Sequence, residues 1–553
     1  MEELSERAYV EALFNAVQHK GKAQVMPVVG KLIALFRDVS PETVMKFATE
    51  AVEKVNGLDA ATRENELRLR APELLTREKK SKPKELRELE GAGQGFTVRL
   101  APFPSGALHI GNVRMLILND EYAKKYKGKL LLVFDDTIGS EEKLPTAESY
   151  DLIREGLEWL GVKWDAEYYK SDRLELFYSW AERLIVQGIA YVCLCDADTL
   201  RKNREKGIAC SHRDQNVDVN LDLWGRMLDG SFAEGEAVLR AKTDISHSNP
   251  AFRDRVLCRI SDREHPRVGR KYRVWPMLEF SWAVDDIELG MTHVIRGKDL
   301  VMEDMMERFI WDRLGIEGPR FEHFGLLRIK GVKISKSKSN KEVATGVYTG
   351  WDDPRTWSLQ SLAARGFRPE AIRSFMVSLG MSLADIEVPV ESIYAENRRL
   401  LEPVAKRYYF VDEPVSIEIE NMDIQGEIES YLHPDRPEFG KRKLLPSNRV
   451  YISGRDFRKM RETEVRLKDF CNVMLEKKAL FTGRENKNIQ RIQWVPVEMA
   501  VEASVVMPDG TIADGYAEPA SLEIKEGETV QFERFGFACL RRKADGLLFY
   551  FTH

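Results

Sequence analysis

A small polar cluster, His109, Gly111 and Asn112, stands where a predicted strand gives way to a predicted helix. The segment 96–100 is short, β-prone and mostly apolar, and from His109 onwards apolar residues recur at helical spacing. Helix N-termini carry unpaired N–H groups and a partial positive charge, so they suit anions, phosphates above all. The cluster therefore predicts a nucleotide site, with an ordinary strand–helix turn as the alternative.

Lysines, serines and glycine interleave in a second segment, LLRIKGVKISKSKSNK, residues 326–341, which we call the lysine loop. Such a loop is too polar to pack into a core. One interpretation is a solvated surface loop, the usual meaning of a run of charge. The other is a mobile phosphate clamp, in which lysines neutralise charge that develops during phosphoryl or adenylyl chemistry.

A candidate metal site has the spacing Cys-x-Cys, fourteen residues, then Cys-x-His, and consists of Cys193, Cys195, Cys210 and His212. Three thiolates and an imidazole are a common ligand set for structural zinc. Half of the six cysteines fall in this short segment, which favours zinc over a chance grouping. The chain has no disulfide framework, and a reducing cytoplasm is the expected compartment.

The elements that must position these residues alternate as strand 96–100, helix 109–126, strand 129–134 and helix 147–160. This alternation predicts a Rossmann-like, doubly wound parallel sheet, in which ligands bind at the carboxyl ends of the strands. Arg99 and the pair Asp135–Asp136 lie at two such ends, which strengthens the nucleotide interpretation. Arg296 lies at the end of a further predicted strand. The alternative to a functional role for this arginine is an ordinary surface salt bridge.

The composition is typical of a soluble globular protein with several domains. The chain has 553 residues, of which 43% are hydrophobic and 31% are charged, and its net charge is −5. No apolar run is long enough to span a membrane. Residues 1–78 have a helical pattern, which predicts either an RNA- or partner-binding module or a packing domain. From residue 408 short alternating runs predict one or two antiparallel β-barrels, which suggest a macromolecular substrate or a structural cap.

Several strings together resemble a known family. The ProPheProSerGly turn, the HisIleGlyAsn helix start and the LysIleSerLysSer loop, in this order, resemble the two signature motifs of class I aminoacyl-tRNA synthetases. ValPheAspAspThr at 133–137, LeuArgAlaLys at 239–242 and GlyMetThrHisValIleArgGly at 290–297 are similar to the archaeal-type glutamyl-tRNA synthetases. The resemblance covers residues 96 to 553, and the N-terminal helices also fit that family's extension.

The resemblance implies a multidomain α/β plus β fold. Its expected parts are an N-terminal helical domain and linker (1–95), the first half of the catalytic domain (96–189), an acceptor-stem-binding insertion with the zinc site (190–270), the second half with the KISKS loop (271–345), a helical connector (346–407) and a β-barrel anticodon-binding region (408–553).

For ATP, the resemblance implies binding by Pro102, His109, Gly111, Asn112, Lys333, Ser335 and Lys336. His109, Lys333 and Lys336 would be catalytic: the histidine stabilises the phosphate as the adenylate forms, and the lysines neutralise the leaving pyrophosphate. Asn112 stands where the family signature has a second histidine.

For the amino acid, the resemblance implies that Arg99 pairs with a carboxylate of glutamate and that Asp135 receives its α-ammonium group. Arg296 would meet the side-chain carboxylate, in a bidentate pair that is strong and geometry-specific. Glutamine would leave this arginine unpaired, so glutamate is the expected substrate. Leu278 and Trp282 replace a tyrosine and an asparagine of bacterial relatives.

The implied reaction joins L-glutamate to tRNA(Glu) through an adenylate, with Mg²⁺ accompanying ATP, and we expect tRNA(Gln) to be charged as well, with an amidotransferase acting downstream. No membrane partner is expected. Lys441, Arg442 and Lys443 are candidate contacts to the tRNA backbone, with a solvated charge run as the alternative. The competing interpretations are a glutaminyl-tRNA synthetase, an adenylyltransferase for a small acceptor and a non-catalytic RNA-binding relative.

Overall fold

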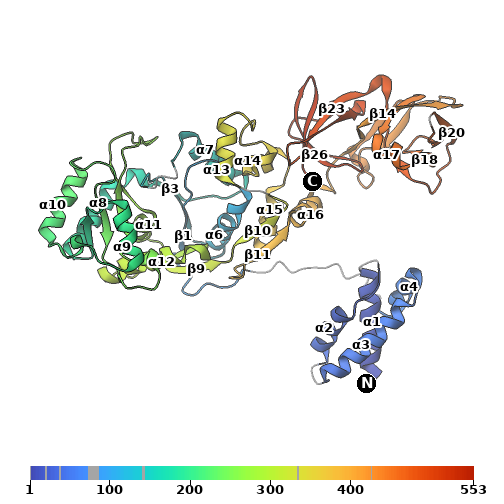
Figure 1. Cartoon of the computed structure of the whole chain (residues 1–553). Helices are drawn as coiled ribbons and strands as arrows, with labels where there is room; N and C mark the ends of the chain where they lie inside the picture. The colour runs from blue at the N-terminus through green and yellow to red at the C-terminus, as the bar shows by residue number, and fades with distance from the viewer. Residues whose placement is uncertain are drawn as a thin grey trace. The chain divides into compact units, whose positions relative to one another are not determined.

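The computed structural model describes residues 2–18, 21–36, 39–71, 86–139, 144–332, 335–424, 426–476 and 478–553 (Figure 1). The chain divides into two compact units, Met1–Pro83 and Lys84–His553. No helix in these described ranges is long and apolar enough to cross a membrane.

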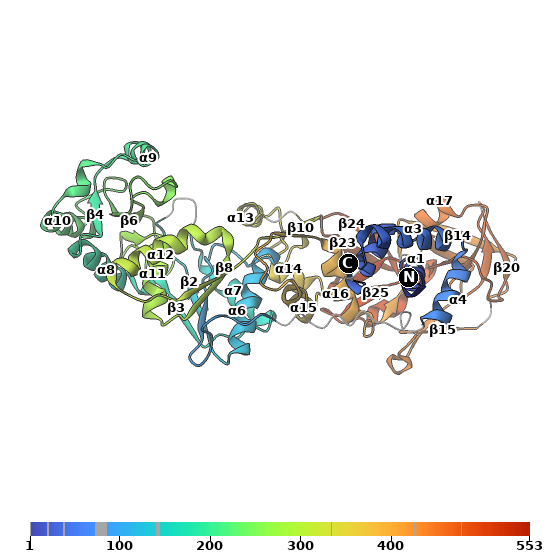
Figure 2. The same cartoon turned by 90° about the horizontal axis from the view of Figure 1, so that it is seen from below.

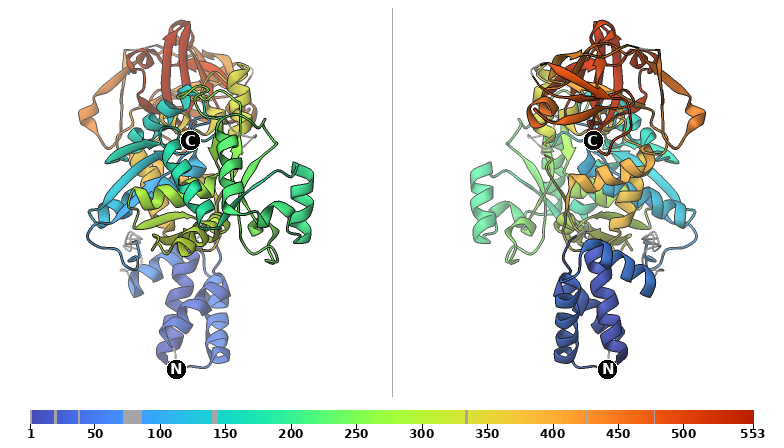
Figure 3. Two further views of the ribbon diagram at one scale, coloured as in Figure 1. Left: turned by 90° about the vertical axis from the view of Figure 1, so that its left-hand side faces the viewer. Right: turned by 90° about the vertical axis from the view of Figure 1, so that its right-hand side faces the viewer.

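The first unit consists of α1 (Glu2–Gln18), α2 (Val25–Leu35), α3 (Pro41–Asn56) and α4 (Ala60–Arg70), which lie side by side (Figure 3). The predicted start of α3 is confirmed: the Ser40 side chain accepts a hydrogen bond from the Thr43 amide at 3.3 Å, and Pro41 occupies the first helical position. Val44, Ala48, Ala51, Val52 and Val55 form its buried face, so this unit has a core of its own.

A parallel sheet forms the centre of the second unit. Strands β1 (Thr97–Leu100), β2 (Lys129–Phe134) and β3 (Ala166–Tyr169) pair in parallel, as do β8 (His293–Gly297) and β9 (Arg320–Phe324). The Thr292 amide donates to the Thr97 carbonyl at 3.0 Å, which joins β8 to β1 edge to edge. The spatial order is therefore β3, β2, β1, β8, β9, the doubly wound arrangement that the alternation predicts.

Helical segments connect or flank these strands in the chain. They are η1 (Ile110–Asn112), α6 (Val113–Lys125), α7 (Ala147–Trp159), η2 (Lys170–Asp172), α8 (Leu174–Val186), α11 (Leu278–Glu288), η5 (Lys298–Leu300) and α12 (Val301–Leu314). The predicted helix 109–126 begins as one turn of 3₁₀ helix before α6. Strand β3 was not predicted from the sequence, because all four of its side chains are only half-buried and carry no apolar run.

Between the two halves of the sheet lies an insertion with its own antiparallel sheet, in the order β4 (Ala190–Cys193), β5 (Val238–Ala241), β6 (Val256–Ile260) and β7 (Val274–Pro276). Its helical segments are α9 (Ala197–Lys206), η3 (Ser211–Asp214), α10 (Val217–Leu228) and η4 (Pro250–Phe252). Figure 2 shows β4 with α8 and α10 beside it. The fully buried Trp224 of α10 shares one core with α8, α11 and α12.

A helical connector follows the parallel sheet. It contains β10 (Leu327–Lys330), α13 (Lys336–Ala344), η6 (Pro354–Thr356), α14 (Leu359–Ala364), α15 (Pro369–Leu379), β11 (Ile386–Pro389) and α16 (Val390–Leu401), with β10 and β11 paired in parallel.

Arg365, at the end of α14, is fully buried in this connector. Its guanidinium lies 4.5 Å from the centre of the Trp357 ring and donates to the carbonyls of Phe551 and Thr552, each at 2.9 Å. The carbonyl of Trp357 in turn accepts from the Ile110 amide at 3.1 Å. The connector thus joins the start of the η1 helix to the last strand of the chain.

The described residues of the C-terminal region contain two seven-stranded sheets. One contains β12 (Arg407–Tyr408), β13 (Phe410–Asp412), β23 (Val501–Val506), β24 (Ile512–Ala517), β25 (Thr529–Phe532), β26 (Gly536–Ala544) and β27 (Gly546–Phe551). The other contains β14 (Pro414–Glu420), β17 (Arg449–Ser453), β18 (Glu464–Leu467), β19 (Asn472–Met474), β20 (Ala479–Gly483), β21 (Arg491–Ile492) and β22 (Val495–Pro496).

A separate hairpin, β15 (Ile428–Tyr431) and β16 (Lys441–Leu444), and the short helices η7 (Pro437–Phe439), α17 (Gly454–Lys459), η8 (Val497–Met499) and η9 (Pro519–Glu523) complete this region. The β-rich prediction is confirmed, but the pairing is mixed: β23 pairs with β27, and β14 with β20, in parallel. Sequence alternation reports which face of a strand is buried and says nothing about its partner.

Candidate active site

The predicted polar cluster forms a reciprocal cap at the start of η1. The Asn112 side chain accepts from the His109 amide at 3.1 Å, and His109 Nδ1 accepts from the Gly111 amide at 3.1 Å. A nitrogen that accepts a hydrogen bond carries no proton, so the imidazole proton sits on Nε2. Asn112, where the family signature has histidine, closes this cap by accepting from the backbone of His109, whereas the Gly111 amide orients the His109 imidazole.

The turn before this cap is held against the end of the lysine loop. Asn340 of α13 donates from Nδ2 to the Ser105 carbonyl at 2.6 Å, across 235 residues of sequence. Gly106 has φ +139°, and a Cβ there would lie 2.7 Å from the Trp351 ring, so only glycine fits. The fold thereby brings the two signature motifs together.

The predicted lysine contacts fall largely outside the described residues. Lys333 lies in the gap at 333–334, and the side chain of Lys336 is likewise outside the description. Ser335 caps α13, where its hydroxyl accepts from the Lys338 amide at 3.3 Å.

A cavity of about 280 Å³ opens beside the cap. Its lining includes four of the predicted residues, Arg99, Gly111, Asn112 and Arg296, together with Trp282. Pro102 and His109 lie within two residues of lining residues in the sequence, but neither they nor Asp135 are part of this lining. The cavity therefore joins the helix N-terminus to the two arginines that the sequence assigns to the amino acid.

Both arginines are buried and already paired with acidic side chains. Arg99 donates from Nη2 to Asp286 at 2.8 Å, whereas Arg296 contacts Asp304 at 2.9 Å and Glu307 at 2.8 Å. Their guanidinium carbons lie 4.9 and 5.0 Å from the Trp282 ring, so one indole packs against both. These contacts fix the two cations before any substrate arrives.

The pKa of Glu307, one of these acids, lies near neutral pH. Burial raises the pKa of Glu307 to about 8, and the charge of Arg296 opposes that rise. Within the described ranges, Arg296 Nη1 and Glu307 Oε2 are buried and have no hydrogen-bond partner. Arg296 therefore retains the two N–H groups of Nη1 for a further acceptor.

The predicted acidic pair, Asp135 and Asp136, follows β2 as expected. Asp135 forms an ion pair with Lys170, with Nζ and Oδ1 2.9 Å apart. Asp136 accepts from the Ser171 amide and from the Tyr150 hydroxyl, each at 2.9 Å, and burial raises its pKa. Asp136 thus holds the strand ends together, whereas Asp135 faces a lysine that the sequence did not single out.

Sequence reasoning missed the partners of the predicted residues. Lys170 escaped notice because β3 was not predicted, so this lysine was not placed at a strand end. Asp304 and Glu307 carried a usable signal: they are three residues apart on the predicted helix 299–314 and therefore share a face, directly after the strand that ends in Arg296.

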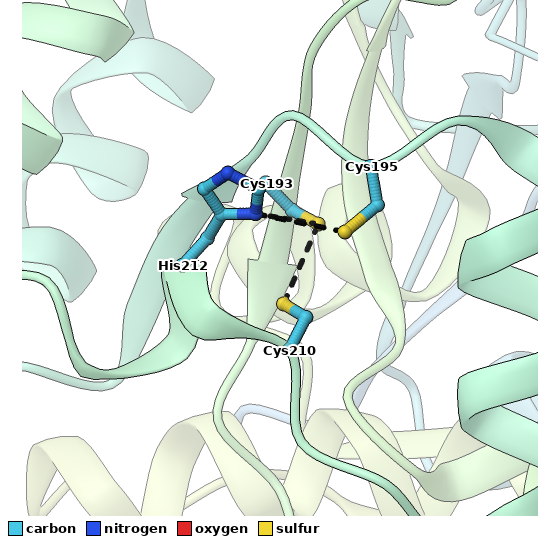
Figure 4. A group of neighbouring side chains, drawn as sticks. All are labelled: Cys193, Cys195, Cys210 and His212. Carbon is cyan, nitrogen blue, oxygen red and sulfur yellow. Dashed lines mark hydrogen bonds between the residues drawn. The ribbon is translucent and has the colours of Figure 1, made fainter.

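The four predicted metal ligands come together, with their ligand atoms all within 4.8 Å of one another (Figure 4). Cys193 Sγ is 3.7 Å from Cys210 Sγ, and Cys195 Sγ is 3.6 Å from His212 Nδ1. The hydrogen bond from Cys193 lowers the pKa of Cys210 to about 4 and raises the pKa of Cys193. This donor set fits zinc.

A buried arginine completes the electrostatics of the cluster. Arg240 Nη1 lies 3.7 Å from Cys193 Sγ and 3.8 Å from Cys210 Sγ. Three thiolates around a divalent cation leave one negative charge, which the guanidinium offsets. The LeuArgAlaLys string thus places its arginine where the cluster needs a positive charge.

The candidate basic patch in the C-terminal region differs from expectation. Arg442 is buried and donates to Glu518 at 2.9 Å, so its assignment as a tRNA backbone contact is wrong. Its neighbours Lys441 and Lys443 are exposed and form ion pairs with Glu429 and Glu427. Alternation along β16 explains the difference, because the middle residue of the run points into the core.

Comparison with protein families gives three matches. The model of class I tRNA synthetases (E and Q), catalytic domain, matches residues 96–403, and two models of the anticodon-binding domain of the same synthetases match residues 405–493 and 491–541. A glutamate–tRNA ligase of Methanothermobacter thermautotrophicus is 42% identical, covering 99% of this chain and 98% of the relative. A glutamate–tRNA ligase of Pyrococcus furiosus is 43% identical, covering 97% of each.

Proposed function

The chain belongs to the class I tRNA synthetases for glutamate and glutamine, and on this premise we propose that it attaches L-glutamate to the 3′ end of tRNA(Glu) through a glutamyl-adenylate. The observation that carries the proposal is the cavity that combines the Gly111–Asn112 helix start with Arg99 and Arg296. A phosphate site and two carboxylate partners in one cavity suit the joining of ATP to a dicarboxylic amino acid.

In the first step glutamate attacks the α-phosphorus of ATP, which enters with Mg²⁺, and pyrophosphate leaves. The His109 Nε2–H donates to the phosphate as charge develops, and Gly111 and Asn112 present backbone to the nucleotide beside Pro102. Lys333 and Lys336 of the lysine loop neutralise the leaving pyrophosphate, and Ser335 contributes to ATP binding. Positioning and charge stabilisation supply the rate, without a covalent enzyme intermediate.

The amino acid is selected by charge. Arg99 meets the α-carboxylate, Asp135 receives the α-ammonium, and Arg296 meets the side-chain carboxylate with its unpartnered Nη1. Burial favours the neutral form of Glu307, so Asp304 is the ionised partner of Arg296. The guanidinium can then pair with a second carboxylate, that of the substrate side chain. Glutamine offers this guanidinium no charge and is rejected.

The tRNA contacts two regions of the chain outside the catalytic domain. We assign residues 190–270 to the acceptor end of the tRNA and residues 408–553 to the anticodon. Cys193, Cys195, Cys210 and His212 would hold zinc, which supplies a structural cross-link at the base of the insertion. A cavity of about 150 Å³ between the C-terminal sheets, lined by Arg455, Gln493 and Arg534 among others, offers donors to an anticodon base.

The proposed second tRNA is tRNA(Gln), whose glutamyl product a downstream amidotransferase would convert. A glutaminyl-tRNA synthetase and a small-acceptor adenylyltransferase are the alternatives. One assay separates them: ATP–pyrophosphate exchange and tRNA charging by the full chain, with glutamate or glutamine, and with tRNA(Glu), tRNA(Gln) or none. We expect charging with glutamate alone on both tRNAs. Charging with glutamine overturns the specificity, and exchange without charging indicates a small acceptor.

A further inference from the structure

Lys170 is a fully buried lysine beside the amino-acid site. It begins η2 directly after β3, and its ammonium forms the 2.9 Å ion pair with Asp135. The same group donates to the Ser281 hydroxyl at 2.6 Å and lies 5.3 Å from the Trp282 ring. The chain's own ammonium therefore occupies the carboxylate that the proposed function gives to the ammonium of the substrate.

A second acceptor for this lysine is available in the same core. Asp285 of α11 is fully buried, and its Oδ1 accepts from Arg173 at 2.7 Å. Its Oδ2 is buried and, among the described residues, has no hydrogen-bond partner. Ser281, which accepts from Lys170, and Asp285 are four residues apart on α11 and therefore share a face of the helix, so the lysine lies on the side of α11 that carries Asp285. Burial raises the pKa of Asp285, and the charge of Lys170 opposes this rise.

We propose that Lys170 and the α-ammonium of glutamate compete for Asp135, and that Lys170 turns to Asp285 when the amino acid binds. The proposal rests on the proposed function, which assigns Asp135 to the α-ammonium. Two ammonium groups on one buried carboxylate repel each other, and the carboxylate balances the charge of only one, so the other favours a second acidic partner. The unpartnered oxygen of Asp285 keeps the displaced lysine paired inside the core.

This exchange makes Lys170 a specificity-determining residue. Because the substrate ammonium only replaces another ammonium, it adds little net affinity in the wild-type protein. Glutarate, which has both carboxylates of glutamate and lacks the ammonium, leaves Lys170 in place and should therefore bind comparably. Without Lys170, Asp135 is a buried carboxylate in need of a cation, and glutamate alone can supply it.

The test is Lys170→Met in the full chain, with ATP–pyrophosphate exchange measured in the presence of tRNA. The quantity is the inhibition constant of glutarate divided by the KM for glutamate. We expect this ratio to rise at least tenfold in Lys170→Met, chiefly through a lower KM. Lys163→Met, which alters an exposed lysine, should leave the ratio unchanged. An unchanged or lower ratio in Lys170→Met overturns the proposal.

Asp285→Asn tests the second half and serves if Lys170→Met does not fold. It removes the charge that attracts the displaced lysine while keeping an oxygen for Arg173, so the KM for glutamate should rise at least threefold with glutarate inhibition unchanged. Equal effects on both ligands, or none, overturn the exchange. Failure of the proposed function is distinct, because the wild-type chain would then show no glutamate exchange at all.

Discussion

Arg296 is a buried guanidinium held by two carboxylates, and within the described ranges its Nη1 has no hydrogen-bond partner, so its removal has a specific expected result. Arg296→Ala should reduce the preference for glutamate over glutamine by about 100-fold or more, because the side-chain carboxylate loses its partner. The measurement is kcat/KM for both amino acids in exchange and charging assays. Unchanged selectivity would refute the assignment.

Arg308→Ala is the matched control for this substitution. Arg308 also packs on the Phe321 ring, with its guanidinium 5.0 Å from the ring centre, whereas the Arg296 guanidinium lies at 4.8 Å. The control thus removes a similar cation–aromatic contact but leaves the cavity lining intact. Its glutamate preference should match that of the wild-type chain.

Glu307 makes the stability of the chain depend on pH. Its pKa in the folded state is about 8 against an ordinary 4.5, because burial disfavours the charged form. The contribution of Glu307 to the stability of the fold is therefore greatest below pH 4.5, falls as pH rises through the interval up to about 8, and levels off above it. Glu307→Gln should flatten this fall, by at most about 1.4 kcal/mol per pH unit.

The measurement is the free energy of unfolding by denaturant between pH 5 and pH 8, and Glu317→Gln, at an exposed glutamate, is the control. If both variants keep the wild-type pH dependence, Glu307 does not titrate in this range.

At this scale the sequence predicted which residues share the cavity, but it did not predict their partners. Arg99, Gly111, Asn112 and Arg296 were all named from motifs. Asp286 and Lys170 come from elements that pack across the sheet, and motif spacing carries no information about such distant contacts. Asp304 and Glu307 follow Arg296 by only 8 and 11 residues, and their helical spacing is a signal from which these two partners could have been predicted.

Among the elements, the metal cluster is the one whose loss is easiest to detect. Cys193→Ser combined with Cys195→Ser should abolish bound zinc, because it removes half of the ligands, and should lower the melting temperature of the insertion. Metal analysis and limited proteolysis of residues 190–215 measure the two effects. Cys258→Ser, at a buried cysteine on β6, should leave metal content unchanged. If metal analysis finds no zinc in the purified wild-type protein, the assignment is wrong.

Helix α13 positions the turn at 102–108 through one hydrogen bond. Asn340→Ala removes the donor to the Ser105 carbonyl and should slow adenylate formation about tenfold, which corresponds to about 1.4 kcal/mol, with the affinity for tRNA unchanged. The rate of adenylate formation is measured in single-turnover experiments, and the affinity for tRNA is measured separately by a binding assay. Equal losses in both would indicate general unfolding instead.

Elements with a strong period were predicted with good boundaries, and weakly patterned ones were not. Strand β2 spans the predicted 129–134, because its apolar run is continuous and ends at the acidic pair. Strand β3 is short and half-buried, so tertiary contacts decide its conformation. The same holds for the parallel pairs in the C-terminal sheets, which join strands far apart in sequence.

For the whole molecule, the division into two units gives a test of what the first unit contributes. Met1–Pro83 has its own core, and the family models begin at residue 96. A chain lacking residues 1–83 should therefore retain adenylate formation within about twofold, measured by pyrophosphate exchange with saturating tRNA. A loss of exchange above tenfold would place part of the active site in the helical unit.

Arg365 has a consequence for how the chain is made. Its guanidinium donates hydrogen bonds to the carbonyls of Phe551 and Thr552, which lie 186 and 187 residues later in the sequence. A ribosome that adds roughly 5–20 residues per second takes roughly 10–40 s to cover that distance. During this interval a charge destined for burial lacks its acceptors, so the connector stays hydrated and open to proteases. Adenylation competence should therefore appear on nascent chains only once β27 has emerged from the exit tunnel.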